Sequence, residues 1–124
     1  QSAKLINQVL VGSQHALLAE AIRFAENLGL DPQRLPECLA GGHADSAMLQ
    51  RLLPRMAARQ FEPPAGFARQ LLKDLDMVLA VAKQTQTPLP ITSEAGMLYR
   101  LLVARGHGSS DSTAILKLYD KPPV

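Results

Sequence analysis

The chain has 124 residues, of which 47% are hydrophobic and 19% charged, so it is long enough for one globular domain and too short for two ordinary ones. Aromatic residues make up only 4% and the formal net charge is +2, which argues against a base-stacking platform and against binding to a phosphate backbone. Cys38 is the only cysteine, so the sequence excludes a disulfide framework and suits a reducing compartment.

The beginning of the chain has no features of a targeting segment. It starts at Gln1, and a helical pattern follows almost at once, without the basic start and short apolar stretch of a signal peptide. No apolar run approaches the roughly 20 residues that a membrane-spanning helix needs. We therefore expect a cytoplasmic protein that does not interact with a membrane, and we expect an upstream part of it to be missing from this chain.

A long first helix is predicted over residues 3–28, where apolar residues cover most of the helix circumference. Such a helix is buried on several sides. Gly29 follows at the position of a left-handed C-cap. At about 1.5 Å per residue the helix would span about 40 Å, so we expect it to be the central helix of the domain.

Two shorter helices and a loop follow. Residues 32–39 form the second predicted helix, which ends before a pair of glycines. The third covers residues 46–53, with a serine as its cap, and Pro54 interrupts or kinks it. Residues 61–67 contain paired prolines and a glycine, which predict a loop.

The second half of the chain predicts three more helices. Apolar residues repeat at three and four positions over 68–86, another helix covers 91–105, and the last begins at Ser109 or Asp111 and fades near Asp120. No stretch alternates with a period of two, and no hairpin turn is present. The sequence therefore predicts an all-α fold, with residues 1–124 forming a single compact domain of about six helices around the long first one.

The first helix carries a polar cluster. Lys4, Asn7 and Gln8 lie three and four residues apart, which places them on one face. In a partly desolvated pocket a lysine gives up its proton more readily and can act as a general acid or base near neutral pH, while the amides could hold a substrate hydroxyl or carboxylate. At a wet helix end the same residues would simply be solvated, and spacing alone favours that interpretation.

The turn at residues 41–46 is a second candidate. Two glycines before a capped helix can present backbone N–H groups to an anion, and His43 and Asp45 could take part in acid–base chemistry. The same residues are also ordinary connections between two helices, which is the more common case.

The remaining polar residues predict little chemistry. Lys73 and Asp76 could pair on the surface of their helix. His15, His107 and Cys38 have no spacing typical of a metal site, so no metal is predicted. Phosphate-binding, dinucleotide-binding and nucleophile-elbow glycine motifs are absent from the sequence.

Taken together and in order, five motifs resemble the C-terminal helical domain of the β-hydroxyacid dehydrogenases, which is of the 6-phosphogluconate dehydrogenase-like type. This is the family of 3-hydroxyisobutyrate dehydrogenase and tartronate semialdehyde reductase, and the resemblance covers nearly the whole chain. The motifs are Ala3-Lys4-Leu5-Ile6-Asn7-Gln8, Gly41-Gly42-His43-Ala44-Asp45-Ser46, Phe61-Glu62-Pro63-Pro64-Ala65-Gly66-Phe67, Leu72-Lys73-Asp74-Leu75 and Asp111-Ser112-Thr113-Ala114.

The resemblance implies a role for particular residues. Lys4 would be the catalytic lysine, a general base in alcohol oxidation and a general acid in the reverse reduction. Substrate binding would fall to Asn7, Gln8 and Gly42, and Lys73 and Phe67 would approach the cofactor. The implied substrate is a small 3-hydroxy acid, such as 3-hydroxyisobutyrate or a glycerate/tartronate semialdehyde pair.

The resemblance also implies partners. NAD or NADP would be bound mainly by an N-terminal Rossmann domain that is absent from this chain, so the isolated chain is expected to be inactive. A homodimer or higher homo-oligomer is expected, and nucleic acid is not. The alternative is a non-catalytic helical dimerisation or interaction module; a DNA-binding module is a distant third, since the basic residues are spread over two segments.

Overall fold

Residues 2–121 are described by a computed structural model, and their fold is all-α, as predicted. Within this range the structure contains no strand, and Phe67 and Asp111 form an isolated antiparallel bridge. The helices are α1 (Ser2–Asn27), η1 (Pro32–Arg34), α2 (Leu35–Leu39), α3 (Ala47–Ala57), α4 (Ala68–Gln84), α5 (Pro90–Leu102), η2 (Val103–His107) and η3 (Ser112–Tyr119).

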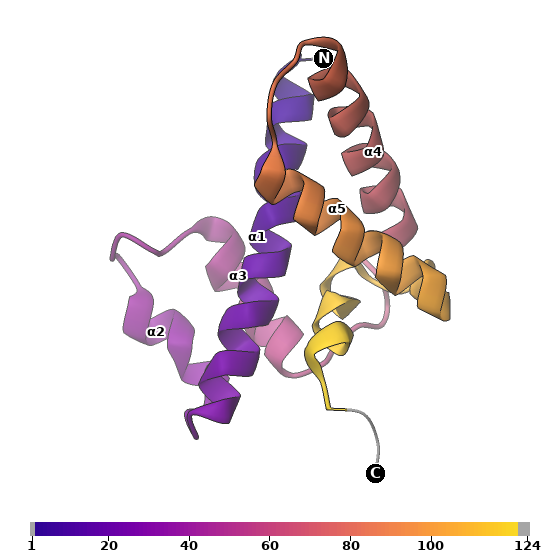
Figure 1. The fold of residues 1–124 in the computed structure, drawn as a ribbon. Coiled ribbons are helices and arrows are strands. Elements are labelled where there is room, and N and C mark those ends of the chain that lie inside the picture. Colours follow the sequence, from indigo (N-terminus) through magenta and orange to yellow (C-terminus); the bar gives the residue numbers. More distant parts are fainter. Residues whose placement is uncertain (1, 122–124) are drawn as a thin grey trace.

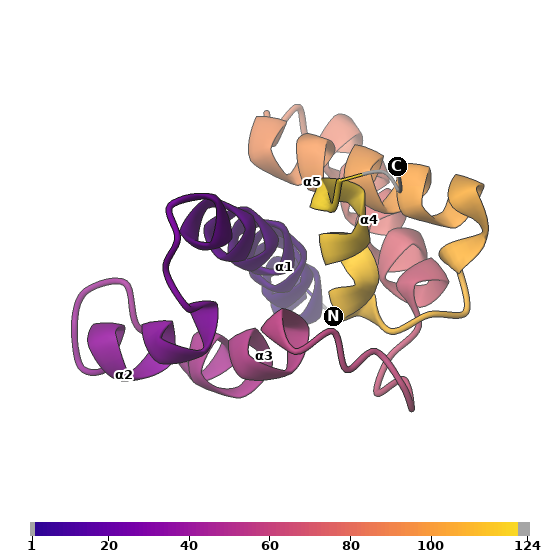
Figure 2. The ribbon, with the colours of Figure 1, turned by 90° about the horizontal axis from the view of Figure 1, so that it is seen from below.

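Helix α1 is the central helix of the domain. Helices α2 and α3 lie on one side of it, and α4, α5 and η3 lie on the other (Figures 1 and 2). All the buried residues of α1 lie from Gly12 onward. A Cβ atom on Gly12 would come within 2.8 Å of Leu75 Cδ2, so the missing side chain lets α1 and α4 approach closely.

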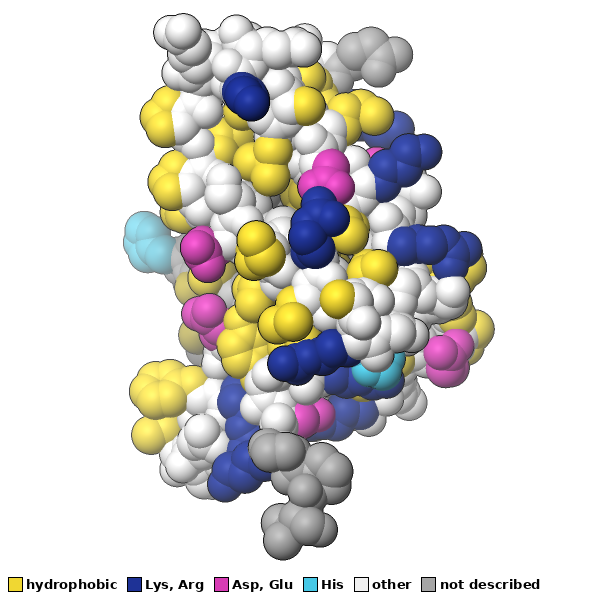
Figure 3. Space-filling view, turned by 45° about the vertical axis from the view of Figure 1, so that its right-hand side comes forward, with side chains coloured by type: hydrophobic (Ala, Val, Ile, Leu, Met, Phe, Trp, Pro, Cys, Tyr) yellow, Lys and Arg dark blue, Asp and Glu magenta, His cyan; other side chains and the backbone are white. Residues whose placement is uncertain are grey.

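The first helix is less completely covered than its sequence predicts. Ile6, Leu10, Leu17 and Phe24 are all more than half exposed, because the packed elements contact its other faces. Hydrophobic side chains also reach the surface on the face seen in Figure 3, with basic and acidic ones distributed between them. None of the helices in residues 2–121 combines the length and the hydropathy that crossing a membrane requires.

Helix α3 continues past the proline at which we expected it to stop. Ser46 caps it as predicted, since its hydroxyl accepts a hydrogen bond from Leu49 N–H at 3.0 Å. Pro54 removes one backbone donor, but the next turn buries Met56 and Ala57 in the core, and this packing keeps the helix going. The helix ends before Arg59, whose φ of 55° is left-handed.

The last helix begins at Asp111, one of the two predicted starts, and is a 3₁₀ helix rather than an α-helix. Asp111 caps it by accepting a hydrogen bond from Thr113 N–H at 2.9 Å. The hydroxyl of Tyr99, a fully buried α5 residue, donates to Ser112 O at 2.8 Å. These contacts attach η3 to the core.

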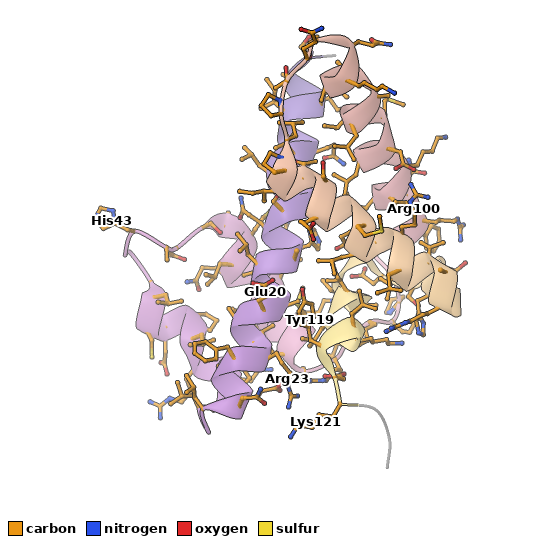
Figure 4. The ribbon with its side chains drawn as sticks, viewed as in Figure 1. Glu20, Arg23, His43, Arg100, Tyr119 and Lys121 are labelled. Carbon is orange, nitrogen blue, oxygen red and sulfur yellow. The ribbon has the colours of Figure 1, made fainter. Side chains whose placement is uncertain are left out.

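An ion-pair network joins the C-terminal ends of α1, α3 and η3. The Arg59 guanidinium lies 2.7 Å from Glu26 Oε2 and 2.8 Å from Asp120 Oδ1. The hydrogen bond from Arg59 lowers the pKa of Glu26. Nearby, the Tyr119 hydroxyl donates to Glu20 at 3.5 Å (Figure 4).

Candidate active site

A cavity of about 460 Å³ lies between the N-terminal half of α1 and α4. Helix α1 contributes Lys4 and Gln8, which are four residues apart and so share a face, and α4 contributes Lys73 and Asp74 from the facing side. Leu5, Gln70, Met77 and Val81 complete the lining. The structure thus brings together three residues that the sequence analysis singled out on two helices, namely Lys4 and Gln8 on α1 and Lys73 on α4.

Amide groups hold the carboxylate of this cavity. Gln8 Nε2 donates to Asp74 Oδ2 at 2.8 Å, and Gln70 Nε2 lies 3.4 Å from Asp74 Oδ1. Asn7 Nδ2 in turn donates to Gln8 Oε1 at 3.0 Å. An ionised carboxylate only accepts hydrogen bonds, so this chain fixes which way the Gln8 amide points. Asn7 acts on the site through Gln8 and is not itself part of the lining.

The two lysines of the cavity are not engaged by the protein. Within residues 2–121, neither Lys4 nor Lys73 takes part in an ion pair, and both side chains are exposed. The cavity therefore combines two available ammonium groups with a carboxylate that amides already hold. This arrangement attracts an anion, such as a small carboxylate.

Phe67 borders the same site. It precedes α4, the residue is 40% exposed, and the Arg69 guanidinium carbon lies 4.4 Å from the ring centroid. Phe67 lines a smaller cavity of about 180 Å³ that shares Gln8, Gln70 and Asp74 with the lysine cavity. An exposed ring thus lies next to the polar groups.

Gly42 lies apart from this cluster. The turn that carries it, next to the labelled His43, is on the other side of α1 from α4 (Figures 1, 2 and 4). Three N–H groups of this turn are bonded within the chain, since Gly41 N–H donates to Asp45 at 2.9 Å, Gly42 N–H to Leu39 O at 3.0 Å and Ser46 N–H to Asp45 at 2.8 Å. The Asp45 carboxylate therefore accepts hydrogen bonds that an external anion would otherwise accept.

Sequence reasoning missed the carboxylate that positions the loop before α4. Asp111 is buried and accepts hydrogen bonds from Ala65 N–H at 2.7 Å, from Thr113 N–H and from the Thr113 hydroxyl. Arg55 lies 3.7 Å from it. Burial by itself would raise the pKa of Asp111, but these hydrogen bonds outweigh burial and lower the pKa. The loop that leads to Phe67 is fixed in this way, and the only sequence signal was the capping pattern at Asp111.

The comparisons with known proteins agree with one another. A family model described as NAD-binding of NADP-dependent 3-hydroxyisobutyrate dehydrogenase matches residues 1–119. The L-threonate dehydrogenase of Cupriavidus necator is 30% identical over 116 residues, covering 94% of this chain and 39% of that protein. The 2-hydroxy-3-oxopropionate reductase of Escherichia coli is 35% identical over 118 residues, covering 94% and 40%.

Solved structures give the same result for the fold. The crystal structure of 3-hydroxyisobutyrate dehydrogenase from Salmonella typhimurium matches with a TM-score of 0.87 and 26% identity, over 94% of this chain and 41% of that one. The chain therefore spans about two fifths of the length of the relatives that it matches.

Proposed function

This chain belongs to the family described as NAD-binding of NADP-dependent 3-hydroxyisobutyrate dehydrogenase, and from that premise we propose that it is the catalytic-lysine domain of an oxidoreductase acting on a small 3-hydroxy acid. The observation that carries the proposal is the meeting of Lys4 and Lys73, from facing helices, in a cavity where neither has an ion-pair partner among residues 2–121.

Each residue of the cavity has a role in this proposal. In alcohol oxidation the neutral amine of Lys4 accepts the hydroxyl proton, and in the reverse reduction its ammonium returns it. The Lys73 ammonium and the Gln8 amide hold the substrate carboxylate and hydroxyl, while Asp74 fixes the direction of Gln8. Because Lys4 is exposed in the described residues, the groups that desolvate it must come with the bound substrate and cofactor.

The rim of the cavity fits a dinucleotide cofactor. Phe67 offers an exposed ring to a flat heterocycle, and Lys73 offers a free ammonium to an anionic group. Bound NAD or NADP supplies the acceptor or donor of the hydride at the carbinol carbon. Residues 2–121 contain no strand, so we propose that a Rossmann-type domain outside them binds most of the cofactor and that the chain alone does not turn over substrate.

The names of the relatives support this substrate class, since L-threonate and 2-hydroxy-3-oxopropionate are both small hydroxylated acids. We extend the proposal to 3-hydroxyisobutyrate and to a glycerate/tartronate semialdehyde pair. The complete protein is proposed to be a cytoplasmic homo-oligomer.

The test uses the protein made from the complete reading frame that contains these residues. Turnover of a panel of 3-hydroxy acids is followed by the absorbance of NADH or NADPH. The Lys4→Ala variant should lose roughly 10²-fold or more in kcat while the cofactor Kd stays the same, because the lysine moves a proton and does not hold the dinucleotide. Lys83→Ala, on the last turn of α4 and outside the cavity lining, is the matched control.

Two outcomes would contradict the proposal. Unchanged turnover in Lys4→Ala would remove the catalytic role of Lys4. Clear turnover by the 124-residue chain alone would remove the need for a separate cofactor-binding domain.

The second candidate is a non-catalytic dimerisation module, and the exposed apolar residues favour it. Leu10 and Leu17 on α1 and Ile91 on α5 line one apolar cavity of about 400 Å³. Light scattering at micromolar concentration measures the association. A module of this kind would dimerise, show no oxidoreductase activity in the complete protein, and be unaffected by Lys4→Ala.

A further inference from the structure

A second polar cavity, of about 260 Å³, lies between α1, α3, the loop at residues 61–67 and η3. His15, Arg51 and Asp111 are among its lining residues, and neither Lys4 nor Lys73 is. Lys4 and His15 are eleven residues apart on α1, which corresponds to about 16 Å along the helix axis. A ligand of a few carbon atoms cannot contact both Lys4 and His15. The cavity of about 180 Å³ that Phe67 lines lies between the two sites, since it shares His15 with this cavity and Gln8 with the lysine cavity.

His15 presents a free acceptor to the cavity. Its Nδ1 lies 2.8 Å from Val11 O, and a carbonyl oxygen only accepts, so Nδ1 carries the proton. His15 is buried, with 7% of its surface exposed. Burial lowers its pKa, which leaves Nε2 as a bare acceptor at neutral pH. Within residues 2–121 the sole occluded side-chain nitrogen or oxygen without a partner is Ser13 Oγ, so Nε2 is not sealed in the core, and His15 lines this cavity and the neighbouring one of about 180 Å³.

Arg51 is the one charge of this cavity that the described residues leave free. Arg55 donates to Gln60 O at 2.8 Å and to Pro63 O at 2.6 Å, and Asp111 is fully used by the loop and by Thr113. Arg51 has no ion pair in residues 2–121 and is exposed. The polar groups open to a ligand are therefore one guanidinium and one imidazole acceptor.

These groups define the chemistry of a ligand. A planar guanidinium matches a carboxylate, and a bare imidazole nitrogen accepts a hydrogen bond from a hydroxyl. Val11, Met48 and Leu52 line the same cavity and suit a short carbon chain. We propose that this cavity is a second binding site for a small hydroxylated carboxylate, with the carboxylate on Arg51 and the hydroxyl donating to His15 Nε2.

The second site rests on the geometry of His15 and Arg51 and does not depend on catalysis at Lys4. A bound acid would contact α1, α3 and the loop that precedes Phe67 at the same time. The ligand class is nevertheless that of the proposed substrate, so the experiment has to separate the two cavities.

The test is a titration of the ¹⁵N-labelled 124-residue chain with 3-hydroxypropionate, followed by the ¹⁵N chemical shift of His15 Nε2. Propionate lacks the hydroxyl and 1,3-propanediol lacks the charge, and each should bind roughly tenfold more weakly. The expected result is a saturable shift of Nε2 with 3-hydroxypropionate. Absence of that shift would overturn the proposal.

Variants show which groups hold the ligand. Arg51→Gln removes an exposed charge and should weaken binding roughly tenfold, whereas Arg51→Lys should lose less. His15→Asn keeps a donor for Val11 O and removes the Nε2 acceptor, so it should also weaken binding. Arg34→Gln, an exposed arginine outside the cavity lining, is the control and should bind normally.

The remaining outcomes separate this inference from the proposed function. Unchanged affinity in Arg51→Gln would overturn the second site. Shifts confined to residues around Lys4 and Lys73 would also overturn it, and would support binding in the lysine cavity. Loss of turnover in Lys4→Ala with an unchanged His15 titration would support both sites independently.

Discussion

Two carboxylates of similar chemistry, Asp111 and Asp74, stand in opposite environments. Asp111 is buried, the loop before α4 and the start of η3 both donate hydrogen bonds to it, and the Arg55 guanidinium lies 3.7 Å away. Asp74 faces an open cavity in which two amides hold it while the neighbouring Lys4 and Lys73 remain available.

The difference separates what maintains the fold from what is available to a ligand. Both carboxylate oxygens of Asp111 accept hydrogen bonds from within the protein, so removing the carboxylate leaves its donors without a partner. Beside Asp74, Lys4 and Lys73 are exposed and have no ion pair within residues 2–121, so removing one has little effect on the folded state. The following predictions test that contrast through the free energy of unfolding, from the largest effect to the smallest.

Replacing Asp111 should have the largest effect. Asp111→Ala leaves the N–H groups of Ala65 and Thr113 without their acceptor and removes the negative charge 3.7 Å from the Arg55 guanidinium, and we expect a loss of about 3 kcal/mol. Urea unfolding followed by circular dichroism measures it. Asp111→Asn keeps one acceptor oxygen and should lose less. A loss under about 1 kcal/mol in Asp111→Ala would mean that the hydrogen bonds accepted by Asp111 are not essential to stability.

Replacing Arg59 should have a smaller effect, because its ion pairs with Glu26 and Asp120 are partly exposed. Arg59→Ala is expected to lose about 1 kcal/mol in the same unfolding experiment. Arg59→Gly should lose less, since glycine adopts the left-handed φ of 55° without strain. A glycine variant less stable than the alanine variant would contradict this expectation.

Acid should weaken the domain through His15. Burial lowers the pKa of His15 in the folded state, so the unfolded chain binds a proton first as the pH falls. Its contribution is fully present above about pH 6.5, the ordinary histidine value, and declines below it. Unfolding free energies measured between pH 8 and pH 5 check this, and His15→Asn should flatten the profile. A profile unchanged by that variant would assign the acid sensitivity to another group.

The lysines should have the smallest effect. Lys4→Ala and Lys73→Ala are each expected to change the unfolding free energy by less than about 0.5 kcal/mol. In the complete protein Lys4→Ala should still abolish most turnover, as proposed above. A destabilisation above about 1 kcal/mol would instead give the lysine cavity a structural role.

Local patterns predicted most of the fold because they act within a few residues. The cap at Ser46, the start at Asp111 and the three- and four-residue repeat of α4 all follow from short-range rules. The predicted end of this helix at Leu53 was wrong, because burial of Met56 in the tertiary core outweighs the local preference against Pro54.

The candidate site could be predicted only in part. Spacing placed Lys4 and Gln8 on one face, but their meeting with Lys73 depends on how α1 packs against α4, which no local pattern encodes. The hydrogen bonds that Asp45 accepts could not be predicted either, since a pair of glycines has the same sequence whether its N–H groups are free or hydrogen-bonded. The roles of Lys4 and Gly42 stay predictions.

The uneven burial of α1 has a consequence for the exchange of its amide hydrogens. The half from Gly12 onward packs into the core, while the half that carries Lys4 has no buried residue. Backbone amides in the first turns should therefore exchange with solvent much faster than those from Gly12 onward, because only the first turns can open without unfolding the domain. Any group that covers the lysine cavity would slow exchange in that half alone.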